Sequence, residues 1–226
     1  MSIELRLALQ EERAEELAQR LRKLLGPTSG QELALDAGCG TGALSVALAP
    51  LVGEVVGLDP NPEYLEAARR VAPENVRFVE GDATALPFDY GMFDIASCLR
   101  VLHHVHRPEL VVSELARVTR PGGRVLVIDQ LGSVDPLRSL EQDRFERLRD
   151  PSHERLLPDA DIRGFLDAND LVLVASDVSR QRVDLERYLE LAGLDEEERV
   201  PIRGLAPGRV YDVELGWYLA RKPGPS

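Results

Sequence analysis

Hydrophobic and polar positions follow two periods along the chain, and the change between them marks the expected helices and strands. Residues 3–25 place leucines at helical spacing among charges, which predicts an amphipathic helix that ends at Gly26-Pro27. Short apolar runs predict buried strands at residues 33–35, 54–58, 76–79, 93–98, 124–129, 171–178 and 210–220. The further expected helices are residues 43–50, 62–71, 108–119, 136–150, 159–168 and 184–205, the last as two helices around Gly193.

The order of these elements predicts the fold class. Over the first 130 residues strand and helix alternate five times, and Pro121-Gly122-Gly123 is expected to form a turn before the fifth strand. Alternation of this kind indicates an α/β protein with helices on both faces of a mostly parallel sheet. Right-handed crossovers then favour a doubly wound sheet. Such a sheet binds ligands beyond the carboxyl ends of its strands, at the switch point beside the first strand.

A single domain over residues 1–226 is expected, because no linker rich in Pro, Gly or Ser divides the chain. We expect residues 30–130 to form a ligand-binding core and residues 1–25 a lid helix. The segments 131–158 and 179–209 are expected to form a helical cap over the carboxyl edge. A second apolar stripe, formed by Leu137, Leu140, Phe145 and Leu148, is expected to pack there.

Charge and cysteine content narrow the function classes. Lys and Arg number 27 against 39 Asp and Glu, a net charge of −12, which argues against nucleic acid or an anionic membrane surface as the main partner. No apolar run approaches the roughly 20 residues of a membrane span, and residues 1–10 lack a signal-peptide core. A cytoplasmic protein without membrane insertion is therefore expected. Cys39 and Cys98 are expected to be reduced thiols, and no spacing predicts a metal site.

The motif LDAGCGTG at residues 35–42 carries the clearest chemistry. Gly38, Gly40 and Gly42 alternate between a strand and a helix, where the missing Cβ atoms allow a tight turn and the close approach of a ligand. Asp36 precedes the first glycine, where its charge would repel a pyrophosphate and suit an ammonium group.

Two further acids end the second and third strands. Asp59, in GLDP, follows the first glycine by 21 residues, where a carboxylate can accept hydrogen bonds from both hydroxyls of a ribose. Asp82, in GDATALPF, ends the next strand in the same way. The pair predicts ribose at one acid and adenine at the other.

Five ordered segments now resemble a known family, the class I S-adenosylmethionine-dependent methyltransferases. They are LDAGCGTG (35–42), VVGLDP (55–60), VRFVEGDATALPF (76–88), FDIASCLRVLHHV (93–105) and ELARVTRPGGRVLVID (114–129). Within the class, the chain resembles the ubiquinone- and menaquinone-biosynthesis-like branch that acts on small molecules. The resemblance implies a Rossmann-like methyltransferase fold with a seven-stranded sheet, and S-adenosylmethionine as the cofactor.

The resemblance also implies individual roles for the cofactor-binding residues. Gly38 and Gly40 would pass the methionine part, while Asp59 would hold the ribose and Pro60 would pack near the adenine. Asp82 and Ala83 would meet the adenine, and Cys98 and Leu99 would line the methionine side. With Asp36 and Gly42, the expected cofactor residues are Asp36, Gly38, Gly40, Gly42, Asp59, Pro60, Asp82, Ala83, Cys98 and Leu99.

The acceptor side is expected to follow the fourth strand. His103 and His104 are the candidate bases, because imidazole titrates near neutral pH. Arg100, Arg149 and His153 are candidate substrate contacts, and Arg suits an acidic acceptor. A structural role for each of these side chains stays open.

The prediction is a monomeric or homodimeric enzyme that transfers a methyl group from S-adenosylmethionine to a small-molecule acceptor by in-line displacement. One alternative is an NAD(P)-dependent oxidoreductase, which Asp36 and Asp82 disfavour. Another is a binding-only protein with a degenerate methyltransferase fold. The acceptor and the methylated atom are not determined at this stage.

Overall fold

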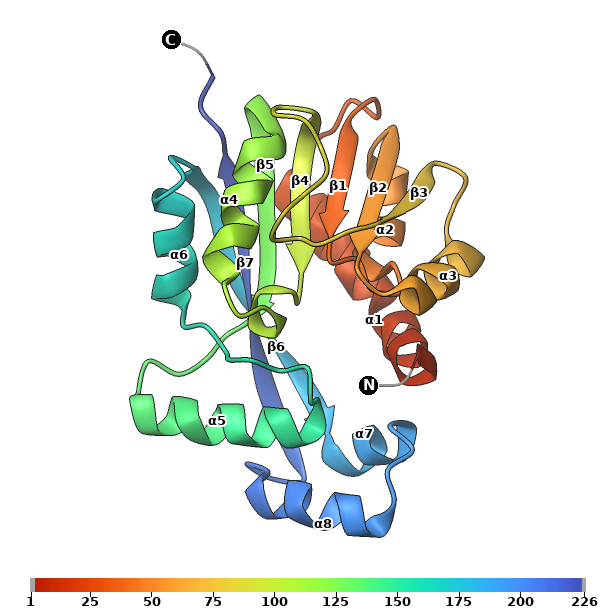
Figure 1. Ribbon diagram of the computed structural model, residues 1–226, viewed down its shortest axis with the longest axis vertical. Coiled ribbons are helices and arrows are strands. Elements are labelled where there is room, and N and C mark those ends of the chain that lie inside the picture. The colour runs from red at the N-terminus through yellow and green to blue at the C-terminus, as the bar shows by residue number, and fades with distance from the viewer. Residues whose placement is uncertain (1–2, 225–226) are drawn as a thin grey trace.

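The computed structural model describes residues 3–224, with every side chain in that range except those of residues 5 and 191. Its strands form one sheet (Figure 1): β1 (Leu33–Ala37), β2 (Glu54–Asp59), β3 (Val76–Glu80), β4 (Phe93–Leu99), β5 (Thr119–Gln130), β6 (Val172–Asp184) and β7 (Val210–Arg221). The helices are α1 (Ile3–Leu25), α2 (Ala43–Leu48), α3 (Pro62–Val71), α4 (Pro108–Val118), α5 (Pro136–Arg149), α6 (Asp159–Asp167), α7 (Leu185–Leu191) and α8 (Glu196–Leu205), with 3-10 turns η1 (Ala49–Leu51) and η2 (Leu102–His104).

The strand order places the ligand-binding edge. It is β3-β2-β1-β4-β5-β7-β6, with β1 to β5 parallel and β7 antiparallel to both its neighbours. The chain thus winds one way from β1 to β3 and the other way from β4, so the connections after β1 and β4 diverge at their carboxyl ends. The predicted doubly wound, mostly parallel seven-stranded sheet is confirmed.

Two apolar layers cover the sheet, as alternating side chains along each strand require. In β1, Leu35 packs in the layer that includes α4 and α6, whereas its neighbour Ala34 packs in the layer with α1 and α2. In β5, Val127 packs in the layer with α4 and α6, and Leu126 packs in the layer with α1 and α2. Figure 1 shows α4 and α6 in front of the sheet and α1 and α2 behind it.

Two sequence expectations about the core need correction. Residues 81–92 contain no helix, so the alternation of strand and helix lapses between β3 and β4. The expected turn at residues 121–123 belongs to β5, with Gly122 at φ +79°. Gly122 donates its N–H to the Lys222 carbonyl over 2.8 Å, and the Lys222 N–H donates to Gly123 over 3.0 Å. Main-chain hydrogen bonds to Lys222, beyond the end of β7, therefore join this segment to the sheet, while its pairing with β4 is irregular.

The last two strands extend beyond the rest of the sheet. β6 runs six residues past the end expected from the sequence and pairs with β7 as far as Asp184 and Val210. Figure 1 shows α5, α7 and α8 around this extension, below the carboxyl edge of the core strands. A small apolar cluster that includes Phe145, Leu189 and Ile202 joins these three helices.

The apolar stripe expected on α5 is mostly wrong. Of its members only Phe145 is buried, whereas Leu137 is 73% exposed and Leu140 and Leu148 are also exposed. The buried face of α5 instead carries two acids, Asp143 and Glu146. This face lies against polar groups of the core and of the segment after α5. The spacing of apolar residues does not reveal a buried face that is polar.

The first prediction concerns α1, whose Leu21 is fully buried against the sheet. Leu21→Ala should lower the free energy of unfolding by about 2–5 kcal/mol, because it removes a core side chain and leaves a cavity. Leu137→Ala, the same change at an exposed helix position, should alter it by less than about 0.5 kcal/mol. Urea unfolding measures both, and equal effects would contradict the docking of α1.

Candidate functional site

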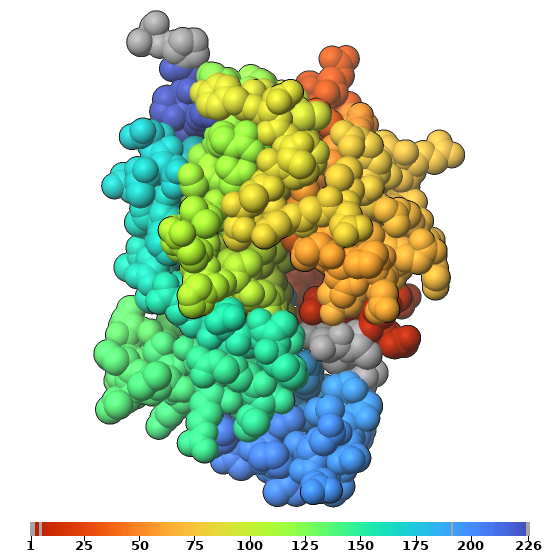
Figure 2. Space-filling model, viewed as in Figure 1, coloured from red at the N-terminus to blue at the C-terminus, as the bar shows by residue number. Residues whose placement is uncertain are grey.

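A cavity of about 500 Å³ lies at the carboxyl ends of the core strands. Its walls come from α1, the loops after β1, β2, β3 and β4, the end of α5 and the segment that follows, and the β6–β7 extension. Figure 2 shows a recess where the red helix α1 meets the orange residues after β2 and the teal residues after α5. The cavity therefore joins the core to the elements that cover it.

The loop after β1 needs its glycines. Gly38, Gly40 and Gly42 have φ of +73°, +53° and +87°, a region that favours glycine. A Cβ atom on Gly38 would lie 2.5 Å from a methyl group of Val101. Gly38 and Cys39 donate their N–H groups to the Leu58 carbonyl over 2.7 and 2.9 Å. The loop is thus held against β2 and lines the cavity with its backbone.

Asp36 is fully buried and lines the cavity from the end of β1. Its Oδ2 accepts a hydrogen bond from the Ser45 hydroxyl over 2.6 Å, and its Oδ1 has no partner among the described residues. Burial raises the pKa of Asp36 to about 7. A buried oxygen without a donor is costly, so the site suits a cationic or hydrogen-bond-donating ligand group.

Asp59 occupies the end of β2 and is 7% exposed. Its Oδ2 accepts the Gly40 N–H over 2.8 Å and its Oδ1 accepts the Asn61 N–H over 2.9 Å. Burial raises the pKa of Asp59. Pro60, which follows it, is exposed and also lines the cavity.

Asp82 and Ala83 bring the third strand end into the same cavity. Asp82 is exposed, and its Oδ1 accepts hydrogen bonds of 2.8 Å from both the N–H and the hydroxyl of Thr84. Ala83 is buried. The three strand-end acids singled out in the sequence therefore face one cavity.

Cys98 was expected to line the cofactor site and does not, whereas its neighbour Leu99 does line the cavity. Cys98 is fully buried in the apolar layer beside α4 and is not part of the cavity wall. Side chains alternate along β4, so consecutive residues cannot both face the same way. Cys98 and Cys39 are both free thiols.

His103 lies in η2 and is 7% exposed. Its Nδ1 is hydrogen-bonded to Oδ1 of Asp129, at the end of β5. Asp129 also accepts the N–H groups of Leu102 and Gln130 over 2.7 Å each. Burial opposes ionisation of Asp129, but the His103 ring and these donors hold its pKa below the usual range. The carboxylate therefore orients the imidazole ring.

Sequence reasoning gave no role to Asp129, although a signal was present. It lies one residue before the end of β5, and Asp36, Asp59 and Asp82 likewise lie within two residues of the ends of the first three strands. What the sequence lacked was the pairing of β4 with β5, which brings Asp129 beside the residues after β4.

His104 and His153 lie next to His103, with ring centroids 4.1 and 5.7 Å away. His104 Nδ1 lies 3.1 Å from the carbonyl and the hydroxyl oxygen of Ser152. Burial and the neighbouring His103 lower the pKa of His104 to about 4. His153 Nε2 lies 2.8 Å from Asp143. His103 is thus the better placed base, and the other two join η2 to the segment after α5.

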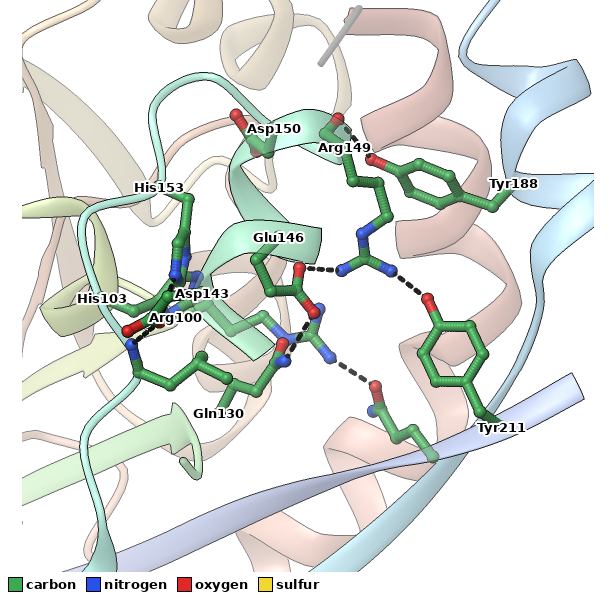
Figure 3. A network of polar contacts seen from close by, with 12 residues as sticks. Arg100, His103, Gln130, Asp143, Glu146, Arg149, Asp150, His153, Tyr188 and Tyr211 are labelled. Atoms are coloured by element: carbon green, nitrogen blue, oxygen red, sulfur yellow. Dashed lines mark hydrogen bonds and ion pairs between the residues drawn. The ribbon is translucent and has the colours of Figure 1, made fainter. Parts of the chain in front are cut away.

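Arg100, after β4, and Arg149, at the end of α5, both reach the cavity (Figure 3). Arg100 has φ +57°, and its Nη2 donates to Gln181 over 2.5 Å. Arg149 donates to Glu146 over 2.6 Å and to the Tyr211 hydroxyl over 2.7 Å, and its Nε lacks a partner among the described residues. All three residues expected to contact substrate, Arg100, Arg149 and His153, therefore line this cavity.

The described residues contain neither a candidate metal site nor a helix that could span a membrane. None of their His, Cys, Asp and Glu side chains form a group of three that could hold a metal ion. None of the helices in residues 3–224 is long and apolar enough to cross a membrane.

Comparison with known proteins gives consistent results. A family described as "Methyltransferase domain" matches residues 35–127. An uncharacterized methyltransferase, YcgJ of Bacillus subtilis, is 38% identical over 141 residues, which cover 61% of this chain and 56% of that protein. A demethylmenaquinone methyltransferase of Clavibacter sepedonicus is 34% identical over 137 residues, or 60% of this chain and 56% of that protein.

The fold comparison extends further along the chain. The crystal structure of YcgJ matches with a TM-score of 0.85 at 25% identity and covers 93% of this chain and 100% of that one. By sequence, the chain spans little more than half the length of the two curated relatives. The ordered motifs, the sheet and these matches show that the chain is similar to methyltransferases, over residues 35–127 by the family match and over 93% of its length by fold.

Proposed function

We propose that this protein transfers a methyl group from S-adenosylmethionine to a small-molecule acceptor. The observation that carries the proposal is the convergence of three strand-end acids, Asp36, Asp59 and Asp82, on one cavity beside a glycine loop. The cofactor has an ammonium group, a ribose and an adenine and lacks a phosphate, so it suits such an acidic wall.

The residues present fit this cofactor. Asp36 offers a buried oxygen without a donor, which an ammonium group would satisfy. Asp59 is held by two backbone N–H groups at the ribose position of the family motif. Asp82 and Ala83 would flank the adenine. Cys98 is not among the proposed cofactor-binding residues, because it packs away from the cavity.

Bound S-adenosylmethionine supplies an electrophilic methyl group, and the chain must orient the acceptor and exclude water. His103 would accept a proton from the acceptor at Nε2, because its Nδ1 is held by Asp129. His104, with its pKa near 4, would remain neutral and contribute to the wall. We assign the cover to α1, α5 and the β6–β7 extension, which supply the outer lining residues.

Related enzymes suggest a class of acceptor. The relatives named demethylmenaquinone methyltransferases act, by their names, on a small molecule. We infer a small-molecule acceptor here as well. The expected cytoplasmic location and the choice between monomer and homodimer stay predictions.

The two alternatives are less well supported. An NAD(P) pyrophosphate would meet the buried carboxylate of Asp36 beside the glycine loop, where like charges repel. A binding-only protein would have no use for a base oriented by Asp129. Calorimetry with S-adenosylhomocysteine and with NAD separates cofactor classes, and a screen of acceptors with isotope-labelled S-adenosylmethionine separates an enzyme from a binding protein.

The ribose assignment gives a direct prediction. Asp59→Ala should weaken S-adenosylmethionine binding by about tenfold or more, because it removes charge-assisted hydrogen bonds. Asp212→Asn, which changes a carboxylate on the β7 surface paired with Arg182, should leave binding unchanged. Calorimetry measures both, with thermal unfolding as a check on folding. Unchanged affinity in Asp59→Ala would refute the ribose contact.

The pKa of Asp36 predicts a pH dependence. The acid is protonated below about 7 in the free protein, and an ammonium ligand favours its ionised form. Binding should therefore release a proton, and S-adenosylmethionine affinity should rise from about pH 5.5 to about pH 7, below the range in which an α-amino group loses its proton.

The control for this prediction is 5′-methylthioadenosine, which keeps the ribose and adenine and lacks the ammonium group. The affinity for 5′-methylthioadenosine should change with pH only through Asp59, because both ligands are expected to contact Asp59. Asp36→Asn should remove the difference between the two ligands. A difference that survives in Asp36→Asn would exclude Asp36 as its source.

The role of His103 can be tested once an acceptor is found. His103→Gln should lower kcat by about 10²- to 10⁴-fold, because proton transfer loses its base, while cofactor affinity stays near that of the unaltered protein. His106→Gln, at a histidine whose side chain is 90% exposed, is the matched control. A normal kcat in His103→Gln would show that the acceptor needs no base at this position.

A further inference from the structure

The acceptor side of the cavity holds more positive charge than the mechanism above uses. Arg13 of α1, Arg100 after β4 and Arg149 of α5 all line it. Figure 3 shows Arg100 and Arg149 both extending toward Glu146. The chain as a whole has a net charge of −12, so a cluster of guanidinium groups at one cavity runs against its overall balance.

The carboxylates near these arginines are already engaged. Glu146 bonds to Arg149 over 2.6 Å and accepts from the Gln130 amide over 3.0 Å. Asp129 is bonded to His103. Near Arg13, Glu12 pairs with Arg187, and Glu16 pairs with Arg20 over 3.1 Å.

Arg13 and Arg100 are therefore not neutralised by a direct ion pair, although carboxylates lie near both of them. Among residues 3–224, neither forms an ion pair with a carboxylate, and the hydrogen bond from Arg100 goes to the neutral amide of Gln181. Burial, together with the charges of Arg13 and Arg149, lowers the pKa of Arg100 to about 10, although Asp129 and Glu146 act in the opposite direction. Burial and Arg149 likewise lower the pKa of Arg13, against the opposite effect of Glu12 and Glu16. No carboxylate of the described residues forms an ion pair with Arg13 or Arg100, an arrangement that suits an added anion.

The backbone conformation of Arg100 supports a functional role for this residue at the cavity. Arg100 has φ +57°, a conformation that non-glycine residues adopt at a cost and that concentrates at functional sites. Its N–H donates to Ile128 over 2.7 Å, which fixes the residue at the edge of the sheet. The strained backbone thus holds a long cationic side chain at the cavity.

The part of the cavity wall supplied by α1 and β7 includes apolar side chains. Leu215 and Trp217 of β7 are buried, and Leu9 and Leu17 of α1 complete this side. Guanidinium groups bind carboxylates and phosphates through paired N–H donors. The site therefore combines an anion-binding group with a surface for an apolar body.

We propose that Arg13 and Arg100 bind an anionic group of the methyl acceptor, so that the substrate is an acid with an apolar body. This inference rests on the proposed methyl transfer and specifies its substrate class. Arg149 is assigned a positioning role, since Glu146 already neutralises it.

The test uses small probes on the protein saturated with S-adenosylhomocysteine. Benzoate, phenyl phosphate and benzamide share a ring and differ in charge, and ligand-observed NMR titration gives their Kd values. At least one anion should bind about tenfold more tightly than neutral benzamide. Preference for benzoate indicates a carboxylate, and preference for phenyl phosphate indicates a phosphate ester. Equal binding of all three probes would overturn the proposal.

Variants locate the effect. Arg100→Gln and Arg13→Gln should each remove most of the preference for the anion. Arg180→Gln is the matched control, because Arg180 precedes Gln181 on β6 but is exposed and pairs with Glu214 over 3.1 Å. Thermal unfolding verifies that the variants fold. A preference that persists in both cavity variants would place the anion elsewhere and overturn the proposal.

The carboxylate of the cofactor is the other anion that these arginines could meet. If they bind the acceptor, both cavity variants keep the affinity for S-adenosylhomocysteine. A loss of about tenfold for S-adenosylhomocysteine, with unchanged 5′-methylthioadenosine binding, would assign the arginines to the cofactor and overturn the proposal.

The failure of the proposed function would look different. A protein that binds no S-adenosylhomocysteine refutes methyl transfer, whatever the probes do. The same probe titration without S-adenosylhomocysteine then reports whether the arginine site binds anions independently.

Discussion

Hydrogen bonding of buried carboxylates at the carboxyl edge of the sheet is the interaction on which the rest of the site depends. An ionised carboxylate is costly to bury unless donors surround it. Asp59, at the end of β2, takes the N–H of Gly40 from the loop after β1. Asp129, at the end of β5, takes the N–H of Leu102 and the ring of His103 from the segment after β4. Each acid thus fixes the loop of the neighbouring strand.

Asp36 differs from these two acids in a way that matters for binding. Its Oδ2 accepts a hydrogen bond from the Ser45 hydroxyl of α2, and its Oδ1 is buried without a donor among the described residues. The fold therefore completes the hydrogen bonding of Asp59 and Asp129 and leaves Asp36 incomplete at the cavity. That difference makes Asp36 the acid whose ionisation a ligand can change.

The elements that cover the cavity are joined to the core by polar contacts as much as by apolar ones. Asp143 accepts a hydrogen bond from the Leu156 N–H and pairs with the His153 ring, while Glu146 accepts one from the Gln130 amide of β5. These acids lie on the buried face of α5, whereas Leu137 and Leu140 of the expected apolar stripe are exposed on another face. Buried polar networks of this kind demand defined geometry, so the same contacts that hold the cover also place Arg149 and His153 at the cavity.

The sequence by itself determined the order of strands and helices, the glycine loop, the three strand-end acids and the histidines after β4. These features depend on local periodicity, on backbone conformations that favour glycine, and on motifs contiguous in the chain. The sequence did not determine which side of β4 carries Cys98, the role of Asp129, the buried face of α5 or the inclusion of Pro121–Gly123 in β5. Each of these depends on contacts between residues far apart in the chain: β4 with β5, α5 with the segment around His153, and β5 with Lys222. Only the tertiary structure decided them, because local periodicity reports which positions are apolar and not which distant polar group will lie opposite.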